Sequence, residues 1–333
     1  MKVSIKDIAA RLGVSPAVVS LVINGKEKEA RINKNTAQRI RDLAAELNYS
    51  PNQIAKGLKK GKSNIIGLIV ADISNPFFAR LTREIEDEAE RFNYKIIIGS
   101  SDESAEKMAS LTNIMKTYQV DGFILVPAEN SEEQIKQLIE NDYPAVLVDR
   151  YLPGIDSNCV LINNVQTANL GTNYLIKQGC RNIALFSYKS ELQHFQERIK
   201  GFKDALKSSG LSFSKENIHF VRFENLYEDL KQGITKILKG SIMYDGIFFA
   251  TDTLALNGIQ ILKNLDVDIS SKFKILSFDE NDTFEFLNFP IPHFAQPLKE
   301  MGKTAVNLLV NLIENENSSK TTKILLTPKW FEK

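Results

Sequence analysis

The first 50 residues carry apolar side chains at intervals of three and four, which is the period of an α-helix. This spacing predicts a first helix over 5–12, ended by Gly13. Ser15-Pro16 then opens a second helix, because serine caps helix N-termini and proline suits the first helical position. That helix stops at Asn24-Gly25, and a third is expected at about 34–47. Two short helices joined by a tight turn that contains glycine predict a helix-turn-helix in an all-α N-terminal domain.

From residue 65 the pattern changes to short apolar runs that alternate with amphipathic segments. The runs predict strands at 65–71, 95–100, 121–126, 145–149, 159–163, 182–187, 218–223, 246–250 and 274–278. The amphipathic segments predict helices at about 77–92, 104–118, 131–141, 166–178, 197–208, 227–239, 253–264 and 298–314. Such alternation is typical of parallel sheets flanked by helices. So many strands favour two similar lobes, with a ligand in the cleft beyond the C-terminal strand ends.

Charge divides the chain at the same place as the hydrophobic pattern. The 333 residues hold 42 Lys and Arg against 41 Asp and Glu, a net charge of +1. Residues 1–62 hold 13 basic and 5 acidic side chains, a net charge of +8, and the remainder has a net charge of −7. A basic head on an acidic body is the asymmetry expected of a nucleic-acid-binding domain attached to a soluble domain.

Composition excludes several other classes of protein. No apolar run approaches the roughly 20 residues that span a bilayer, and the N-terminus has no apolar core of a signal peptide. Two cysteines make neither a disulfide framework nor a zinc site, and they favour a reducing cytoplasm. The three histidines lack metal-ligand spacing, and neither a nucleophile elbow nor a dinucleotide fingerprint is present. We therefore expect no metal, no cofactor and no enzymatic activity.

Short motifs follow one another in order along the whole chain. The N-terminal ones are Ile5-Lys6-Asp7-Ile8-Ala9, Gly13-Val14-Ser15, Val19-Ser20, Asn24-Gly25, Leu47-Asn48-Tyr49-Ser50-Pro51-Asn52 and Ile54-Ala55-Lys56-Gly57-Leu58. The later ones are Ile66-Gly67-Leu68-Ile69, Asp72-Ile73-Ser74-Asn75-Pro76-Phe77-Phe78, Val120-Asp121-Gly122-Phe123-Ile124, Leu147-Val148-Asp149-Arg150, Asp252, Ala255, Ser277-Phe278-Asp279 and Gln296-Pro297. Together they resemble the LacI/GalR family of bacterial transcription regulators.

The resemblance implies a division of the chain into three parts. It predicts a helix-turn-helix DNA-binding headpiece at 1–50, a hinge helix and linker at 51–62, and an effector-binding and dimerisation domain at 63–333. The last part resembles type I periplasmic binding proteins, with an N-lobe at about 63–162 plus 293–322 and a C-lobe at about 163–292 plus 323–333. The implied protein is a cytoplasmic homodimer, preferred over a tetramer. It is expected to bind palindromic double-stranded operator DNA and to have no membrane partner. It acts as a repressor controlled by a small-molecule effector, most often a sugar.

The second helix of a helix-turn-helix lies in the major groove, with its N-terminal side chains at the base edges. The candidate DNA-binding residues are Ser4, Lys6, Ser15, Pro16, Ala17, Ser20, Leu21, Asn24, Lys26, Tyr49, Asn52, Ala55, Leu58 and Lys59. Ala17 and Leu21 offer apolar contact to thymine methyl groups, whereas the family often has polar side chains there. Arg31 and Asn35 are further candidates for phosphate contact.

Leu58 is the sharpest prediction of the linker. The family analogue is a leucine wedged into the minor groove at the operator centre, which kinks the duplex. Gly57 beside it lowers helix stability by roughly 1 kcal/mol. We therefore expect the hinge helix to order only when two chains pair over DNA, so that the spacing of the two hinges controls DNA affinity.

Candidate effector-binding residues follow the predicted strands, at positions that match the family's cleft. They are Asn75, Phe77, Phe78, Asp149, Arg198, Asp252 and Asp279, with Asn163, Asn164, Gln193 and His194 as further candidates. Phe77 is expected to stack on the effector ring. Arg198 and Asp279 are expected to make two-point hydrogen bonds to hydroxyl groups. Leu81 and Ile85 are expected at or under the dimer interface.

Three alternatives remain open on sequence alone. A carboxylate pair acting on a sugar would make the protein an enzyme, although no residue pattern nominates such a pair. A binding protein for transport would share the effector fold, but the basic headpiece argues against it. Within regulation, a partner protein could replace the small metabolite as the signal.

Overall fold

Local signals set the boundaries of the three N-terminal helices in the computed structural model, which describes residues 3–49, 62–315 and 321–332. Helix α1 (Ile5–Leu12) begins with a capping box, in which Ser4 and Asp7 satisfy each other's backbone N–H groups. It ends at Gly13, whose left-handed conformation (φ 66°) closes the helix. Helices α2 (Pro16–Ile23) and α3 (Lys34–Glu46) complete the bundle. These bounds agree with the predicted ones.

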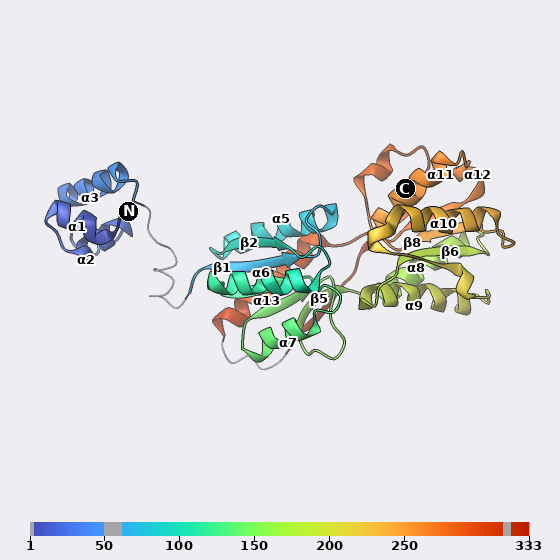
Figure 1. The fold of residues 1–333 in the computed structure, drawn as a ribbon, viewed down its shortest axis with the longest axis horizontal. Helices are drawn as coiled ribbons and strands as arrows, with labels where there is room; N and C mark the ends of the chain where they lie inside the picture. Colours follow the sequence, from blue (N-terminus) through green and yellow to red (C-terminus); the bar gives the residue numbers. More distant parts are fainter. Residues whose placement is uncertain (1–2, 50–61, 316–320, 333) are drawn as a thin grey trace. The chain divides into compact units, whose positions relative to one another are not determined.

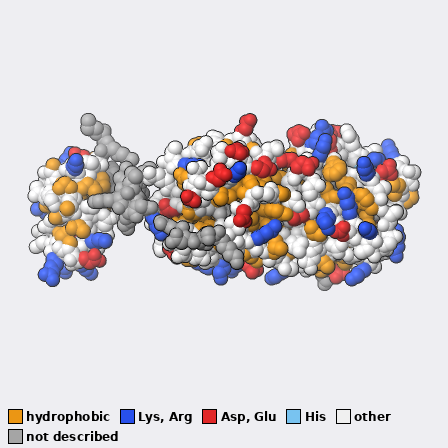
Figure 2. All heavy atoms as spheres, turned by 90° about the horizontal axis from the view of Figure 1, so that it is seen from below, with side chains coloured by type: hydrophobic (Ala, Val, Ile, Leu, Met, Phe, Trp, Pro, Cys, Tyr) orange, Lys and Arg blue, Asp and Glu red, His pale blue; other side chains and the backbone are white. Residues whose placement is uncertain are grey.

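Contacts divide the chain into two units, residues 1–63 and 64–333. The first unit has its own core, in which Ile8, Val19 and Ile40 are completely buried. Figure 2 shows Lys and Arg side chains around the edge of one face of this unit, with hydrophobic side chains at its centre. A small bundle with a separate core and a basic surface is an independent module.

The second unit contains two parallel sheets, each covered by helices on both faces (Figure 1). The first sheet has the order β11-β5-β4-β3-β1-β2, and the second has the order β7-β6-β8-β9. The strands of the first sheet are β1 (Ile65–Val70), β2 (Lys95–Ser100), β3 (Gly122–Leu125), β4 (Ala145–Val148), β5 (Asn158–Ile162) and β11 (Lys323–Leu326). Those of the second are β6 (Ile183–Tyr188), β7 (Ile218–Val221), β8 (Gly246–Phe249) and β9 (Lys274–Ser277).

Alternation along β1 explains how the first sheet is covered on both faces. Leu68 points into the core beneath α5 and α13, whereas Ile69 packs into the separate core beneath α6 and α7. The helices of this lobe are α5 (Pro76–Arg91), α6 (Ala105–Thr117), α7 (Glu132–Glu140) and α13 (Leu298–Glu314). Leu81 and Ile85 on α5 are completely buried inside the subunit. Their burial rules out a place at the surface of a dimer interface, and a place under it stays a prediction.

The second lobe is built on the same plan. Its helices are α8 (Asn164–Lys177), α9 (Gln193–Ser208), α10 (Leu226–Lys239), α11 (Asp252–Asn264) and the short α12 (Ile269–Lys272). Single turns of 3-10 helix occur at η1 (Lys215–Asn217), η2 (Phe223–Asn225) and η3 (Asp282–Phe286). No helix among the described residues is long and apolar enough to cross a membrane.

The last segments of the chain differ from the predicted division into lobes. Strand β11 pairs in parallel with β5 in the first sheet, whereas the family resemblance predicts that 323–333 belongs to the C-lobe. Strand β10 (His293–Ala295) pairs with β12 (Lys329–Phe331) and packs on the second lobe, whereas the predicted return to the N-lobe is at 293. These strands are three or four residues long, so their pairing is decided by distant partners and not by their own pattern.

Candidate functional site

The turn between α1 and α2 brings the two helices of the N-terminal unit into a helix-turn-helix. The Ser15 hydroxyl accepts a hydrogen bond from the Val18 N–H at 3.3 Å and fixes the start of α2. Val19 and Val22 bury one face of α2 in the bundle core. The opposite face is therefore left free for another molecule.

Pro16 and Ala17 on that free face are exposed, and Ser20 and Leu21 beside them are partly exposed. The same region carries exposed Lys6 and Lys26. This exposed face is long and narrow enough to enter a DNA major groove, which admits one α-helix. Its contacts would be mainly to thymine methyl groups and phosphates, because its centre is apolar.

Other DNA-binding candidates have structural partners within the unit. Ser4 belongs to the capping box of α1, and the Asn24 side chain donates to the Ser20 carbonyl oxygen at 2.7 Å. Tyr49 packs partly buried against the core of the bundle. Asn52, Ala55, Leu58 and Lys59 lie outside the described residues.

The second unit has a cavity of about 340 Å³ between its two lobes, at the C-terminal ends of their strands. This is where ligands bind in open parallel sheets, and the volume lies within the range of small-molecule sites. All seven candidate effector residues line it: Asn75, Phe77, Phe78, Asp149, Arg198, Asp252 and Asp279. The chain distance between the first and last of them exceeds two hundred residues, so the fold assembles this cleft.

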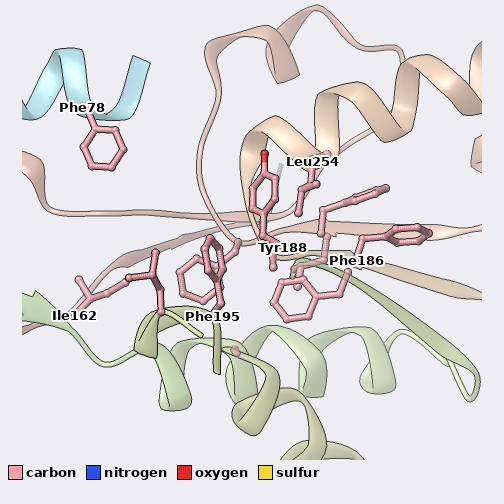
Figure 3. Close-up of a cluster of buried hydrophobic side chains, with 14 of the residues drawn as sticks. Phe78, Ile162, Phe186, Tyr188, Phe195 and Leu254 are labelled. Carbon is pink, nitrogen blue, oxygen red and sulfur yellow. The ribbon is translucent and has the colours of Figure 1, made fainter. Parts of the chain in front are cut away.

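Aromatic rings line the cleft from both lobes. Phe77 and Phe78 at the start of α5 lie edge to face, with ring centroids 5.0 Å apart. Figure 3 shows Phe78 on the first lobe and Tyr188 and Phe195 on the second. Tyr188 also stacks on Phe223 at 4.1 Å. Apolar ring faces suit the C–H faces of a flat ligand and leave its edges to polar groups.

Arg198 is the centre of a buried network in the second lobe. It is 3 % exposed, and its guanidinium lies 3.6 Å from the centroid of the Phe278 ring. It donates to Asn164 Oδ1 at 3.0 Å, to the Ala250 carbonyl oxygen at 2.6 Å and to Asp279 Oδ2 at 3.3 Å. Arg198 thus pairs with Asp279 and its neighbours, and its hydrogen bonds to ligand hydroxyl groups stay a prediction.

A second buried arginine, Arg150, lies in the first lobe. Its two terminal nitrogens donate to both oxygens of Glu103 at 2.6 and 2.7 Å, a bidentate pair. Its Nε lies 3.5 Å from Asp149 Oδ2. Burial raises the pKa of Asp149 to about 6, although Arg150 and Arg198 oppose this shift. Asp149 is therefore a buried carboxylate that is stabilised only in part by its neighbours.

Asp252 and His194 complete the polar lining. Burial raises the pKa of Asp252, and its strongest opposing contact is the hydrogen bond from Asn281 Nδ2 at 2.8 Å. Burial, with Arg150 and Arg198 nearby, holds the pKa of His194 well below its usual range, so its ring is neutral. His194 Nδ1 and Gln296 Oε1 are both buried without a hydrogen-bond partner. Such atoms favour a ligand that can donate and accept hydrogen bonds.

Part of the cleft carries no signal in the sequence, and three of the further candidates do not line the cavity. Glu103, Tyr188, Phe195 and Phe223 line it without a motif that marks them, and Arg150 and Gln296 stand in motifs without being singled out. Asn163, Asn164 and Gln193 do not line it: Asn163 caps α8 by accepting from the Gln166 N–H, and Asn164 accepts from Arg198. Among the described residues, no group of three or more His, Cys, Asp or Glu side chains could hold a metal ion.

Comparison with known proteins covers the whole chain. The family model for periplasmic binding proteins and the sugar-binding domain of the LacI family matches residues 63–333. The model for bacterial regulatory proteins of the lacI family matches residues 4–52. Catabolite control protein A of Priestia megaterium is 31% identical over 318 residues, which cover 95% of this chain and 94% of that protein.

Solved structures agree with these matches. A LacI family regulator from Enterococcus faecium with bound ribose is 25% identical, with a TM-score of 0.69. The alignment covers 80% of this chain and 97% of that one. The lac repressor dimer bound to operator and an anti-inducer has a TM-score of 0.83 at 18% identity, with 100% and 98% of the two chains covered. This second likeness shows that the two chains share their fold in both the N-terminal and the second unit.

Proposed function

The chain belongs to the LacI family of bacterial regulatory proteins, and from this premise we propose which of its residues recognise DNA and which bind the effector. Membership makes the protein a DNA-binding transcriptional regulator and not an enzyme. It also excludes a binding protein for transport, because residues 4–52 match the DNA-binding model of the family. What remains to be assigned is the chemistry of the two sites.

We assign operator recognition to the exposed face of α2. Pro16, Ala17, Ser20 and Leu21 face the bases, and Lys6 and Lys26 bind phosphates on either side. The linker residues Asn52, Ala55, Leu58 and Lys59 are assigned to the minor groove, as the family resemblance implies. The domain boundaries proposed from sequence, with a headpiece to residue 50 and a hinge at 51–62, are kept.

We assign effector binding to the cleft between the lobes of the second unit. The observation that carries this proposal is that the seven residues expected from the family resemblance line one cavity. The effector is a sugar or sugar derivative: a related regulator binds ribose, and aromatic faces with buried carboxylates suit a polyhydroxyl ring. The protein acts as a cytoplasmic homodimer on palindromic DNA, where effector binding changes lobe closure and thereby operator affinity.

Operator binding with and without sugars tests this proposal. Selection from random duplexes with the full chain yields the operator, which is expected to be palindromic. Fluorescence anisotropy then measures operator affinity with D-ribose, D-glucose, cellobiose or a purine present. At least one sugar is expected to change the dissociation constant by about 5–150-fold, the usual range of allosteric coupling. A response to purines alone would overturn the carbohydrate assignment, and no response would favour a partner protein.

A further inference from the structure

We infer that the effector cleft selects uncharged polyhydroxyl ligands and rejects the phosphorylated forms of the same sugars. This inference rests on the proposed function, because it concerns the charge of a ligand in the same cleft. It is drawn from how the charged side chains around the cavity are paired among themselves.

Both cations among the described residues that line the cavity are already used by the protein. Arg150 is held by both oxygens of Glu103 and by the Pro127 carbonyl oxygen at 3.1 Å. Arg198 is held by Asn164, Ala250 and Asp279. A phosphate would have to share a guanidinium that already compensates a buried carboxylate, even at Arg198, where the bonds described involve Nε and Nη1 only. Weakening a buried pair leaves its carboxylate with less compensation, which is unfavourable.

Carboxylates outnumber cations in the same lining. Asp72, Glu103, Asp149, Asp252 and Asp279 line the cavity, against the two arginines. The neutral ring of His194 adds no positive charge. Asp149 and Asp252 are 5 % exposed each; Asp149 shares Arg150 with Glu103, and Asp252 has no ion pair among the described residues. An anion placed among them meets like charges in a medium that screens them poorly.

Helix N-termini are the other common phosphate site, and side chains cap those of α5 and α11 at this cavity, whereas α9 begins there without a side-chain cap. Helix α5 begins at the cavity, and the Asn75 side chain accepts from the Phe77 N–H at 2.9 Å. Helix α11 also begins there, and the Thr251 hydroxyl accepts from the Leu254 N–H at 3.2 Å. Asp252 places a carboxylate in the first turn of α11. Both helix ends are therefore capped by the chain's own side chains.

Hydroxyl groups match what the cavity leaves unsatisfied. The carboxylates of Asp149 and Asp252 and the buried Gln296 Oε1 all accept hydrogen bonds from a donor. His194 Nδ1 donates or accepts a hydrogen bond according to its tautomer. A sugar hydroxyl donates and accepts at once, and the Phe77 and Tyr188 rings can cover the faces of the sugar. An uncharged polyol satisfies these groups without disturbing either arginine.

Calorimetry on the full chain tests the inference with matched pairs of ligands. The pairs are D-ribose with D-ribose 5-phosphate and D-glucose with D-glucose 6-phosphate. The neutral sugar that binds is expected to bind at least tenfold more tightly than its phosphate, which corresponds to about 1.4 kcal/mol. Equal or tighter binding of the phosphate overturns the inference and leaves the carbohydrate assignment intact. Binding of neither member of any pair counts against the carbohydrate assignment itself, and the inference falls with it.

The variant Asp252→Asn tests whether charge or size causes the preference for the neutral sugar over its phosphate. The substitution keeps the side-chain volume and the acceptor for Asn281, but it removes one negative charge from the cavity. Affinity for the neutral sugar is expected to fall, and the ratio between neutral sugar and phosphate is expected to shrink severalfold. Glu106→Gln, on an exposed side chain of α6 outside the cavity, is the control and is expected to keep both affinities. An unchanged ratio in Asp252→Asn would show that charge does not set the preference.

Discussion

Asp149 combines burial with an unusual backbone conformation. Its φ of 68° lies in the left-handed region, which Asn and Asp tolerate better than other residues apart from glycine. It closes β4 at the cleft, and its carboxylate is turned into the protein with Arg150 beside it. A buried carboxylate of this kind lowers the free energy of unfolding, and such residues are common at binding sites.

Asp149→Asn is expected to change how stability depends on pH. The folded-state pKa of about 6 lies above the usual value of 3.8, so the native state binds this proton more tightly than the unfolded chain. The group therefore lowers wild-type stability as pH rises from about 4 to 6, by on the order of 2–3 kcal/mol. Asparagine does not ionise and removes this loss. The melting temperature of the variant relative to wild type should therefore be higher above pH 6 than at pH 4.

Asp266→Asn is the matched control for that experiment. Asp266 has a similar left-handed conformation, with φ 54°, but its side chain is exposed. The melting temperature of the Asp266→Asn variant should equal that of wild type at every pH. If Asp149→Asn followed wild type in the same way, Asp149 would not be a destabilised carboxylate.

Ala17 is the residue that best tests the recognition face. Ala17→Glu places a carboxylate on the exposed N-terminal part of α2, where we expect DNA phosphates and base edges. Operator affinity should fall at least tenfold, measured by fluorescence anisotropy, whereas effector binding stays unchanged. Ala45→Glu adds the same charge on exposed α3 and should have a much smaller effect. Equal losses in the two variants would mean that only net charge matters.

Among the elements, α9 supplies three lining residues of the cleft, as many as α5. It begins at Gln193, four residues before the predicted start at 197, so that His194 and Phe195 fall in its first turn and reach the cavity. It carries Arg198 one turn later. The close packing of α9 on α8 sets the position of all three side chains.

Gly201 makes this packing possible. A Cβ at this position would lie 2.2 Å from the Val165 carbonyl oxygen of α8, far closer than any real contact. Gly201→Ala should therefore push the helices apart, with a loss of about 1–3 kcal/mol or more in the free energy of unfolding. The shift should also weaken the bond between Arg198 and Asn164 and lower effector affinity. Denaturant unfolding and calorimetry measure the two effects.

Lys207→Ala, on the exposed side of α9, is the control for Gly201→Ala. It keeps the helix and removes no packing, so stability and effector affinity should both stay near wild type. A Gly201→Ala variant with wild-type stability would show that α8 and α9 are not in tight contact.

At the scale of the whole molecule, the near-neutral net charge hides two oppositely charged parts. Residues 1–62 have a net charge of +8, and the remainder has a net charge of −7. The basic part is matched to phosphates, and the acidic body discourages nonspecific contact of the large domain with DNA.

Salt should therefore act differently on the two sites. Phosphate contacts release counterions, so operator affinity should fall by about a hundredfold or more between 50 and 200 mM salt. The effector site is buried between the lobes and, on our inference, takes an uncharged ligand. Its affinity should change by less than about twofold over the same range. Titrations at four salt concentrations measure both slopes, and a flat slope for DNA would contradict the phosphate contacts.

The sequence by itself determined the elements of the headpiece and the order of strands and helices in the body. Helical period, caps and apolar runs are local properties, so α1, α2 and most strands of the sheets could be predicted within a few residues. Seven cleft residues could be predicted too: six follow strand ends in motifs of the family, and Arg198 matches a family position on a predicted helix.

Only the tertiary structure decided which groups meet. Arg150 pairs with Glu103, Arg198 pairs with Asp279, and β11 joins β5, and each pairing links segments far apart in sequence. No local pattern encodes such a meeting, since it depends on how the sheets fold over one another. For the same reason the sequence could name Arg198 and several carboxylates of the cleft, but only their arrangement in space shows that both cations lining it already pair with carboxylates.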